Sequence, residues 1–282
     1  MDSLTGGIVL YNPNLVRLRE NINAVINQLD LLILIDNGST NINEVKRIYK
    51  DVSKIKIIES KFNKGIAWAL NKIMYQAKEN KSEWCLLLDQ DTICPNNLIT
   101  SYLDYLNKTD EEIAIICPLV YDLNKDKNQA YHEKESQLVQ NCITSGTLNS
   151  ISIWEKVGEF DERLFIDGVD HEYCLRLDIN NFKIVRMNKV SIFHEIGKIT
   201  YKRFLFWRIE TKNHNSFRKY YIVRNIFYLE KKYKKDGFAK TIMKVLKQFF
   251  LVIYLEDDKL LKLKKMILGV IDGLKMNYNT EI

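Results

Sequence analysis

The first two-thirds of the chain alternates between short apolar runs and longer stretches in which apolar residues recur at helical spacing. Apolar runs of about four to eight residues are typical of strands buried on both faces of a sheet. The predicted strands cover residues 7–11, 31–35, 55–58, 84–88 and 113–120. The predicted helices cover residues 15–29, 42–49 and 65–78, with a fourth that follows Pro95 and ends near Leu106. This order predicts an α/β fold with a mostly parallel sheet flanked by helices on both faces.

Between this region and residue 200 the patterns are weaker. Residues 121–137 are polar and weakly periodic, which predicts a surface loop. We expect residues 142–153 to contain a strand and a turn, and residues 161–177 to pass from a loop into a helix. The apolar run 190–193 predicts a further strand that ends at His194.

From Tyr201 onward the spacing is helical and rich in lysine and aromatic residues, with clear amphipathic stretches at 238–255 and 260–274. We therefore expect two parts, residues 1–200 and a basic helical C-terminal region of residues 201–282. Basic amphipathic helices can lie in a membrane interface. More commonly, their apolar stripe packs on the neighbouring domain or on a second subunit.

The composition of the 282 residues is that of an ordinary globular protein, with 46% hydrophobic residues. Five scattered cysteines without a C-x-x-C pair indicate reduced thiols in a cytosolic protein rather than a disulfide framework or a zinc knuckle. No secretory signal is visible, and the longest apolar run, residues 249–255, is far too short to span a bilayer. We expect a cytoplasmic protein.

The net charge of +6 is unevenly distributed, because lysines and arginines outnumber acidic residues between Lys198 and Lys275. A basic surplus of this kind is typical of proteins that bind nucleic acid, an anionic membrane surface or an acidic ligand. Charge alone does not distinguish among the three.

Two carboxylates follow the apolar run 84–88 directly, since only Gln90 separates Asp89 from Asp91. Open α/β sheets bind ligands beyond the carboxyl ends of their strands, and an extended chain points alternate side chains the same way. A hard divalent cation that carries a phosphorylated ligand would relieve the repulsion between the two carboxylates. A solvated acidic turn is the commoner explanation of an isolated pair, so the interpretation depends on the rest of the chain.

Asp36 follows the apolar run 31–35 in the same way. Its carboxylate can accept hydrogen bonds from a ribose hydroxyl or a base N–H, although an Asx turn or a helix N-cap is its more usual role at such a place. In the sequence Asn63-Lys64-Gly65, the glycine lets the backbone approach a phosphate and the lysine would meet its charge. A turn that opens a helix explains these residues equally well.

Residues 165–176 hold an unusual cluster, in which Asp167, Asp170, His171 and Glu172 fall within six positions. Asp170 falls in the first turn of the expected helix, where the macrodipole stabilises an ionised carboxylate. A carboxylate directed into a cleft is a good general base for a hydroxyl group. N-capping with an ion pair to Arg176 is the alternative reading.

Taken in order, these segments resemble the inverting glycosyltransferases of family two, which have a nucleotide-sugar-binding domain of the GT-A type. Most of the motifs are weak individually, but their order is specific, and the resemblance covers residues 7–197. The segments that carry it are residues 9–12, 35–39, 63–67 with Asn71, 89–91, 160–162 and 169–176. The resemblance implies a Rossmann-like GT-A catalytic domain in residues 1–200.

The resemblance also implies roles for individual residues. Tyr11 and Asp36 would contact the base and ribose of the donor, and Asp89 would lie near the ribose and sugar. Asp91 and His194 would bind Mn²⁺ or Mg²⁺ on the diphosphate. Asp170 would be the general base. The remaining expected donor contacts are Asn12, Asn63, Gly65, Asn71 and Gln90, and the residues expected to contact the acceptor or to support the site are Gly146, Asp167, His171, Glu172 and Arg176.

One position departs from the family's pattern, because Val169 stands where the motif has a glutamate before its aspartate. Asp170 keeps the carboxylate that the role of base requires. The acceptor contacts of the missing glutamate would then fall to Glu172 or Asp167.

Gln90, together with Arg218-Lys219-Tyr220-Tyr221 and Arg224-Asn225, is similar to the rhamnosyltransferase branch of the family. Members of that branch take L-rhamnose from a dTDP donor and build bacterial surface polysaccharide such as capsule or cell wall. The resemblance implies dTDP-L-rhamnose as donor and a glycan or polyprenyl-diphosphate-linked acceptor, with no role for nucleic acid. It suits a protein at the inner face of the cell membrane, or a homodimer formed through the C-terminal helices. A galactofuranosyl or other hexosyl donor carried by UDP remains an alternative.

Three other classes fit less well. A dinucleotide oxidoreductase needs G-x-G-x-x-G after the first strand, whereas Gly6 and Gly7 fall at its start. A nucleotidyltransferase should have a phosphate-binding loop richer in glycine, arginine and lysine near its N-terminus. A non-catalytic sugar- or nucleotide-binding module would explain the basic, aromatic C-terminal third but gives the acidic residues no purpose.

Overall fold

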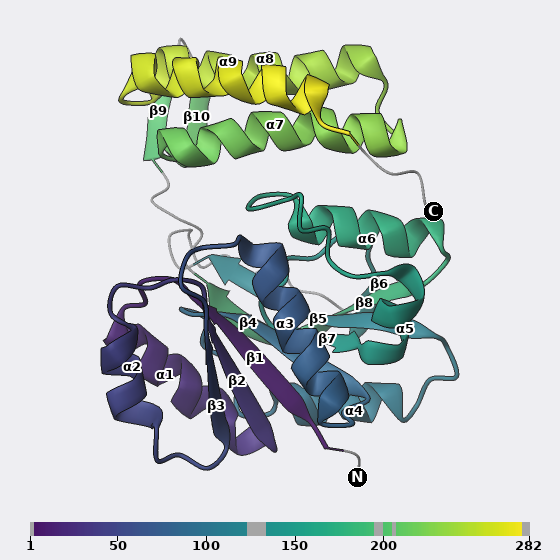
Figure 1. Ribbon diagram of the computed structural model, residues 1–282. Helices are drawn as coiled ribbons and strands as arrows, with labels where there is room; N and C mark the ends of the chain where they lie inside the picture. The colour runs from purple at the N-terminus through teal and green to yellow at the C-terminus, as the bar shows by residue number, and fades with distance from the viewer. Residues whose placement is uncertain (1–2, 123–133, 195–199, 205–206, 278–282) are drawn as a thin grey trace. The chain divides into compact units, whose positions relative to one another are not determined.

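The computed structural model describes residues 3–122, 134–194, 200–204 and 207–277 (Figure 1). The chain forms two compact units. The N-terminal unit comprises Met1–Arg163 and Val169–Glu195, and the C-terminal unit comprises Leu164–Gly168 and Ile196–Ile282. A five-residue segment inside the first part of the sequence therefore belongs to the C-terminal unit.

An eight-stranded sheet forms the centre of the N-terminal unit, in the order β3-β2-β1-β4-β7-β5-β8-β6. Its strands are β1 (Thr5–Leu10), β2 (Leu31–Asp36), β3 (Ile55–Glu59), β4 (Trp84–Asp89), β5 (Ile113–Asp122), β6 (Ser136–Leu138), β7 (Thr147–Ser150) and β8 (Lys183–His194). β1 pairs in parallel with β2 and β4, β2 with β3, and β5 with β8. Within this sheet, the described strand pairs that are antiparallel are β4 with β7, β5 with β7 and β6 with β8. This confirms the mostly parallel sheet that the sequence predicts.

Helices cover both faces of this sheet. They are α1 (Leu15–Val25), α2 (Ile42–Tyr49), α3 (Ile66–Glu79), α4 (Leu98–Leu106), α5 (Ile151–Val157) and α6 (Val169–Ile179), with a short 3₁₀ turn at Ile26–Gln28. Ile8 and Leu10 of β1 pack in a core with α1, α2 and α4. Gly7 faces the other way, toward α3, where a Cβ atom would lie 2.2 Å from Ile73. Glycine at this position lets α3 approach the sheet.

Between residues 134 and 194 the structure contains more helix and strand than the sequence predicts. α5 follows β7 directly because the Ser150 hydroxyl accepts a hydrogen bond from the Ile153 N–H and caps the helix. β8 begins seven residues before the apolar run at 190–193, since polar side chains such as Arg186 and Asn188 interrupt its hydrophobic pattern. Of the loop expected at residues 121–137, residues 123–133 lie outside the described ranges.

The C-terminal unit contains a hairpin of β9 (Thr200–Phe204) and β10 (Trp207–Thr211), followed by α7 (Ser216–Tyr233), α8 (Phe238–Leu255) and α9 (Lys259–Lys275). The prediction that this region is helical from Tyr201 is wrong for the hairpin. Trp207, Ile209 and Thr211 alternate with Arg208 and Glu210, and this period of two is a strand pattern. α8 has the predicted bounds, and α9 is one residue longer at each end.

α7 and α9 pack closely because α9 presents two glycines to the backbone of α7. A Cβ atom on Gly269 would lie 2.5 Å from the Tyr220 carbonyl oxygen, and one on Gly273 would lie 2.6 Å from that of Arg224. The core of the unit is formed by Val223, Phe227, Val245, Val252 and Met266. Among the residues described, no helix is both long and apolar enough to cross a membrane.

Candidate active site

The carboxyl ends of β2, β1 and β4 lie side by side at one edge of the sheet. Leu10 at the end of β1 pairs with Asp36, and Val9 pairs with Asp89. Tyr11 follows β1 directly and is 49% exposed. The structure therefore brings Tyr11, Asp36 and Asp89 to a common edge, as their positions after predicted strands imply. We call this edge the donor edge.

Asp36 is buried and holds the turn that follows β2. Its carboxylate accepts hydrogen bonds from the N–H groups of Gly38 at 3.2 Å and Ser39 at 3.1 Å. Gly38 has φ +86°, and a Cβ atom there would lie 2.7 Å from the backbone nitrogen of Asn63. Asp36 thus has the turn role that is usual at such a place. Only glycine at position 38 allows the close contact between the loop after β2 and the loop before α3.

Side-chain amides fix the loops of the donor edge. Asn12 accepts a hydrogen bond from the Thr40 N–H at 2.8 Å. The Gln90 side chain accepts from the Tyr11 N–H at 2.9 Å and donates to the Tyr11 carbonyl oxygen at 3.4 Å. Gln90 therefore holds the backbone of Tyr11 across 79 residues of sequence. Any contact that Asn12 or Gln90 makes with a donor stays a prediction.

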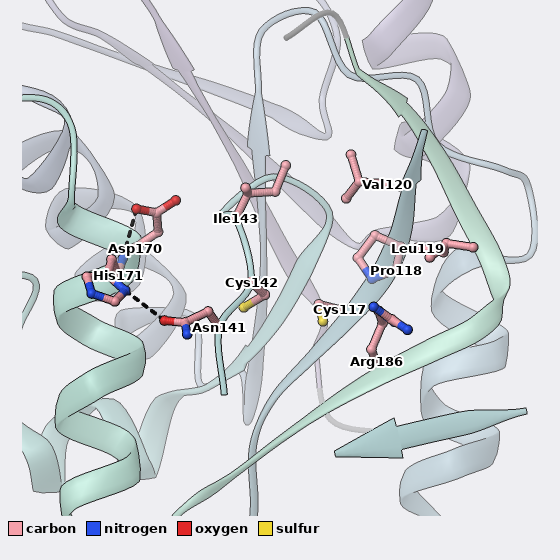
Figure 2. Close-up of a pocket in the computed structure, with 10 residues that line it drawn as sticks. All are labelled: Cys117, Pro118, Leu119, Val120, Asn141, Cys142, Ile143, Asp170, His171 and Arg186. Carbon is pink, nitrogen blue, oxygen red and sulfur yellow. Dashed lines mark hydrogen bonds between the residues drawn. The ribbon is translucent and has the colours of Figure 1, made fainter. Parts of the chain in front are cut away.

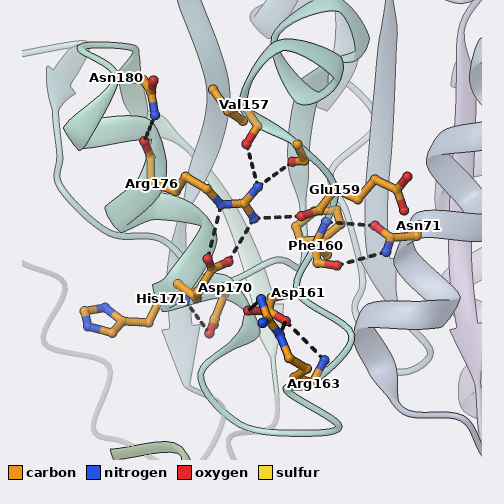
Figure 3. Close-up of polar contacts among 12 residues, drawn as sticks. Asn71, Val157, Glu159, Phe160, Asp161, Arg163, Asp170, His171, Arg176 and Asn180 are labelled. Carbon is orange, nitrogen blue, oxygen red and sulfur yellow. Dashed lines mark hydrogen bonds and ion pairs between the residues drawn. The ribbon is translucent and has the colours of Figure 1, made fainter. Parts of the chain in front are cut away.

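Asn63 and Asn71 also bond to nearby backbone. The Asn63 side chain accepts from the Gly65 N–H at 2.9 Å, at the start of α3. The buried Asn71 amide accepts from the Phe160 N–H and donates to the Phe160 carbonyl oxygen, both at 2.9 Å (Figure 3). Asn71 thereby joins α3 to the loop that precedes α6, and its expected contact with the donor stays a prediction.

Glu172 and Arg176 anchor α6 to the preceding loop. Glu172 is 0% exposed, and the Arg176 guanidinium donates to its carboxylate at 2.9 and 3.1 Å. The same guanidinium donates to the carbonyl oxygens of Val157, Gly158 and Glu159 at 2.6–2.8 Å (Figure 3). This burial disfavours Glu172 as a substitute for the acceptor contacts of the family's missing glutamate.

Sequence reasoning missed three residues that hold the acidic turn after β4. The Asp89 N–H donates to the Ser145 hydroxyl at 2.9 Å, and that hydroxyl lies 2.6 Å from the Thr92 hydroxyl. The buried Asn21 amide donates to the Asp89 carbonyl oxygen at 2.7 Å. Asn21 gave a usable signal, because it interrupts the apolar face of α1. Ser145 and Thr92 gave none.

A cavity of about 410 Å³ lies beside the start of α6 (Figure 2). Its lining is Cys117, Pro118, Leu119, Val120, Asn141, Cys142, Ile143, Asp170, His171 and Arg186. Asp170 accepts a hydrogen bond from the His171 N–H at 2.8 Å, and the His171 ring nitrogen Nδ1 lies 2.8 Å from the Asn141 side-chain oxygen. The cavity thus combines apolar walls with a carboxylate, an imidazole and a guanidinium, a combination typical of small-molecule binding sites.

Gly146 connects this cavity with β4. Its N–H donates to the Leu87 carbonyl oxygen at 2.8 Å, and its carbonyl oxygen accepts from the Tyr102 hydroxyl at 2.9 Å. A Cβ atom on Gly146 would lie 2.9 Å from Pro118 in the cavity wall. Glycine at this position therefore leaves room for Pro118 in the cavity wall.

Within the described ranges, no three histidine, cysteine or acidic residues come close enough together to hold a metal ion by themselves. The side chain of His194 lies outside what the structure describes. The backbone places His194 at the end of β8, one residue after Phe193, which forms an antiparallel bridge with Ile93. The end of β8 and the turn that carries Asp91 are therefore neighbours.

Comparison with known proteins identifies the family. Residues 7–186 match the family model described as Glycosyl transferase family 2. The chain belongs to glycosyltransferase family 2. The match covers more than half of its length and includes the donor edge and Asp170, so the protein is a glycosyltransferase.

One relative and two solved structures extend the comparison. The dTDP-rhamnosyl transferase RfbF from Shigella flexneri is 30% identical over 295 aligned residues, which cover 95% of this chain and 94% of that protein. GalNAc-T7, solved with UDP, GalNAc and Mn²⁺, has a TM-score of 0.64 at 14% identity over 95% of this chain. The TarS 1-349 fragment from S. aureus has a TM-score of 0.58 at 12% identity over 96% of this chain and 80% of its own. This chain spans 54% of the GalNAc-T7 chain, and these two structures support the GT-A fold.

Proposed function

We propose that this glycosyltransferase transfers L-rhamnose from dTDP-L-rhamnose to a hydroxyl group of a glycan or lipid-linked acceptor during synthesis of bacterial surface polysaccharide. The observation that carries the donor assignment is the 30% identity to RfbF, a dTDP-rhamnosyl transferase, over 95% of the chain. Because this similarity extends past residue 186, it includes the C-terminal unit as well as the family domain. Transfer of galactofuranose or another hexose from a UDP-sugar is the alternative.

Asp170 is the proposed general base. It lies in the first turn of α6, where the helix dipole favours its ionised form, and it lines the cavity in which an acceptor sugar would bind. The carboxylate takes the proton of the acceptor hydroxyl as that oxygen bonds to the anomeric carbon. The bond from the anomeric carbon to the diphosphate breaks at the same time, and dTDP leaves with the electron pair. A single displacement of this kind inverts the anomeric configuration.

The donor edge supplies the binding groups for the nucleotide. The exposed Tyr11 residue offers an apolar ring face to the base, and Asp36 is the proposed hydrogen-bond acceptor for the base or ribose. Gln90 keeps Tyr11 in place through both of its backbone hydrogen bonds. A site whose loops are already bonded to one another loses little conformational entropy when the donor binds.

The residues at the end of β4 fit a divalent cation. Carboxylate oxygens, as on Asp89 and Asp91, are the ligands that Mg²⁺ and Mn²⁺ prefer, and imidazole also suits Mn²⁺. The pairing of Ile93 with Phe193 brings the backbone of His194 close to the turn that holds Asp91. We assign Asp91 and His194 as the residues that would hold it. When bound, the cation supplies positive charge that stabilises the leaving diphosphate.

Replacing Asp91 by alanine is expected to weaken donor binding only when the metal is present. Titration calorimetry of dTDP-rhamnose with and without Mn²⁺ should show a metal-dependent gain in affinity for the wild type and none for Asp91→Ala. Asp104→Ala, which removes an exposed carboxylate from α4, is the matched control and should bind like the wild type. An Asp91→Ala variant that keeps the full gain from Mn²⁺ would exclude Asp91 as a ligand.

The donor itself is tested by thermal unfolding with dTDP-L-rhamnose, UDP-galactofuranose and UDP-glucose, each with Mn²⁺. A ligand that binds the native state stabilises it by about 2.7 kcal/mol at 100 times its Kd. We expect the largest rise in Tm, and release of the nucleoside diphosphate, with dTDP-rhamnose. A larger effect of a UDP-sugar would support the alternative donor, and binding without turnover would support a non-catalytic module.

The C-terminal helices α8 and α9 expose a surface that suits contact with a membrane. Apolar side chains are exposed on both α8 and α9, among them Met243, Leu246, Leu260 and Ile267, and lysines flank them. We propose that this surface meets the anionic inner face of the cell membrane, which would bring a polyprenyl-linked acceptor to a cytoplasmic enzyme. The alternative is that the same helices pack on a second copy of the chain in a homodimer.

A further inference from the structure

The segment Leu164–Gly168 leads directly into α6, so Asp170 lies two residues beyond its end. Arg163 before the segment and Val169 after it belong to the N-terminal unit, whereas the segment itself belongs to the C-terminal unit. The chain thus enters the C-terminal unit immediately before the helix that carries the proposed base.

Two side chains of α7 bond to this segment. The Arg218 guanidinium donates from Nε to both carboxylate oxygens of Asp167 at 3.0 Å and from Nη2 to one of them at 2.8 Å. The Asn225 amide, which is 3% exposed, donates to the carbonyl oxygens of Ile166 at 2.8 Å and Asp167 at 2.5 Å. Charge-assisted, multidentate contacts of this kind are among the strongest polar interactions in proteins.

Aromatic packing adds to the polar contacts. The Phe165 ring stacks on Tyr221, with ring centroids 5.1 Å apart, and meets the edge of Phe217 at 5.8 Å. The Arg224 guanidinium lies 4.5 Å from the Tyr221 ring centroid and donates to the Asn225 side-chain oxygen at 2.9 Å. All the side chains that make these polar and aromatic contacts with the segment come from α7.

The backbone at the end of the segment is in the left-handed region. Asp167 has φ +64° and Gly168 has φ +84°. For a residue other than glycine, the left-handed region costs about 1 kcal/mol or more and persists where the surroundings enforce it. α6 begins at the next residue, Val169.

We propose that Arg218 and Asn225 are positioning residues for catalysis: they hold residues 164–168 so that Asp170 is presented to the acceptor hydroxyl in a reactive geometry. The proposal rests on the proposed function, in which Asp170 is the base. A displacement of about 1 Å at a reacting group can lower a rate by about 10²-fold. The contacts also make the C-terminal unit a requirement for catalysis, because the residues that place the base lie on α7.

The test is a double-mutant cycle with Asp167→Asn and Arg218→Gln, measured as release of dTDP from dTDP-L-rhamnose to water or to octyl glycosides. Asparagine tolerates a positive φ, so Asp167→Asn removes the charge and keeps the backbone preference. We expect each single variant to lower kcat by about 10–100-fold with an unchanged Kd for dTDP-rhamnose. The double variant should be no slower than the slower single variant, because both changes remove the same contact.

Two further variants distinguish the positioning role from a general loss of stability. Arg218→Lys keeps the charge and should recover part of kcat. Lys244→Gln removes an ion pair with Asp236 elsewhere in the C-terminal unit and should keep wild-type kcat. Amide hydrogen exchange should become faster for peptides that cover residues 164–171 in Arg218→Gln, while peptides from α8 and α9 stay protected.

The outcomes distinguish this inference from the function on which it rests. If Asp170→Asn kept the wild-type kcat, the assignment of the base would fail. If Asp170→Asn lost activity but Arg218→Gln kept the wild-type kcat, the positioning role would be overturned. Loss of kcat with unaltered exchange at residues 164–171, or additive effects in the double variant, would also overturn it.

Discussion

Replacing Asp170 by asparagine is expected to lower the rate of transfer by about 10²–10⁴-fold, the usual contribution of a general base. Asparagine has nearly the same shape, and its side-chain oxygen can still accept the hydrogen bond from the His171 N–H that Asp170 accepts at 2.8 Å. The variant therefore loses the ability to take a proton while the start of α6 keeps its local contacts. Because the donor edge is built from β1, β2 and β4, the Kd for dTDP-rhamnose should not change.

The measurement is the steady-state release of dTDP together with the donor affinity from calorimetry. Asp178→Asn, an exposed position on the same helix, is the matched control and should keep both values. A loss of donor affinity parallel to the loss of rate would indicate that Asp170 contributes to donor binding instead. A wild-type rate would show that another group removes the proton.

Replacing Glu256 by glutamine is expected to destabilise the C-terminal unit by about 3–5 kcal/mol. Glu256 is 2% exposed and lies between two buried lysines, at 2.7 Å from Lys219 and 3.1 Å from Lys262, and it also accepts from the Thr211 hydroxyl at 2.8 Å. These residues join β10, α7 and α9 to the end of α8. Glutamine would leave two buried ammonium groups without a compensating charge. Burial already lowers the pKa of Lys219, against the attraction of Glu256.

The pH dependence of stability follows from the same cluster. Burial disfavours the charged form of Glu256, but hydrogen bonds from Lys219 and Thr211 and the charge of Lys219 outweigh it and hold the pKa of Glu256 below its usual 4.5. A carboxylate with a depressed pKa stabilises the folded state above its usual pKa, and this contribution is lost as the pH falls through the folded value. Wild-type stability should therefore fall below about pH 4.5 by an amount that Glu256→Gln does not show.

Hydrogen exchange of α7 peptides measures this effect for the C-terminal unit by itself. Asp258→Asn is the control, since it removes an exposed charge at a positive φ that asparagine also adopts. Protection of α7 equal to that of the wild type in Glu256→Gln would show that the buried cluster contributes no net stability.

The sequence predicts the frame of the N-terminal unit well because its strands are nearly continuous apolar runs. The predicted helix at 42–49 and the predicted helix at 238–255 have the bounds that the structure shows for α2 and α8. The strands that form the donor edge were also placed within a few residues. In these segments, hydrophobic periodicity and tertiary packing favour the same local structure.

Elements stabilised by polar side chains could not be predicted from hydrophobic periodicity. The first half of β8 carries Arg186 and Asn188, which bond to each other at 3.0 Å, and thus has no apolar run. The hairpin of β9 and β10 is rich in charged residues, and the sequence predicts it as part of a helical region. The alternating strand pattern covers only a few positions, whereas the three helical patterns that follow it are long.

The same limit applies to the site. Carboxylates after apolar strands were expected to converge, and Asp36 and Asp89 do lie at one edge. The positioning contacts of Asn71 and Gln90 could not be foreseen, because their partners lie 89 and 79 residues away in the sequence. Nor did the sequence indicate that Glu172 is enclosed with Arg176, since spacing alone does not separate a buried ion pair from a cleft-facing carboxylate.

The proposed reaction is a single displacement at the anomeric carbon of dTDP-L-rhamnose, with Asp170 as the base. The most direct test is the anomeric configuration of the rhamnoside that the wild-type enzyme forms, determined by NMR from the one-bond C1–H1 coupling of the purified product. We expect a rhamnoside whose anomeric configuration is opposite to that of the donor. A product that retains the donor's configuration would contradict it.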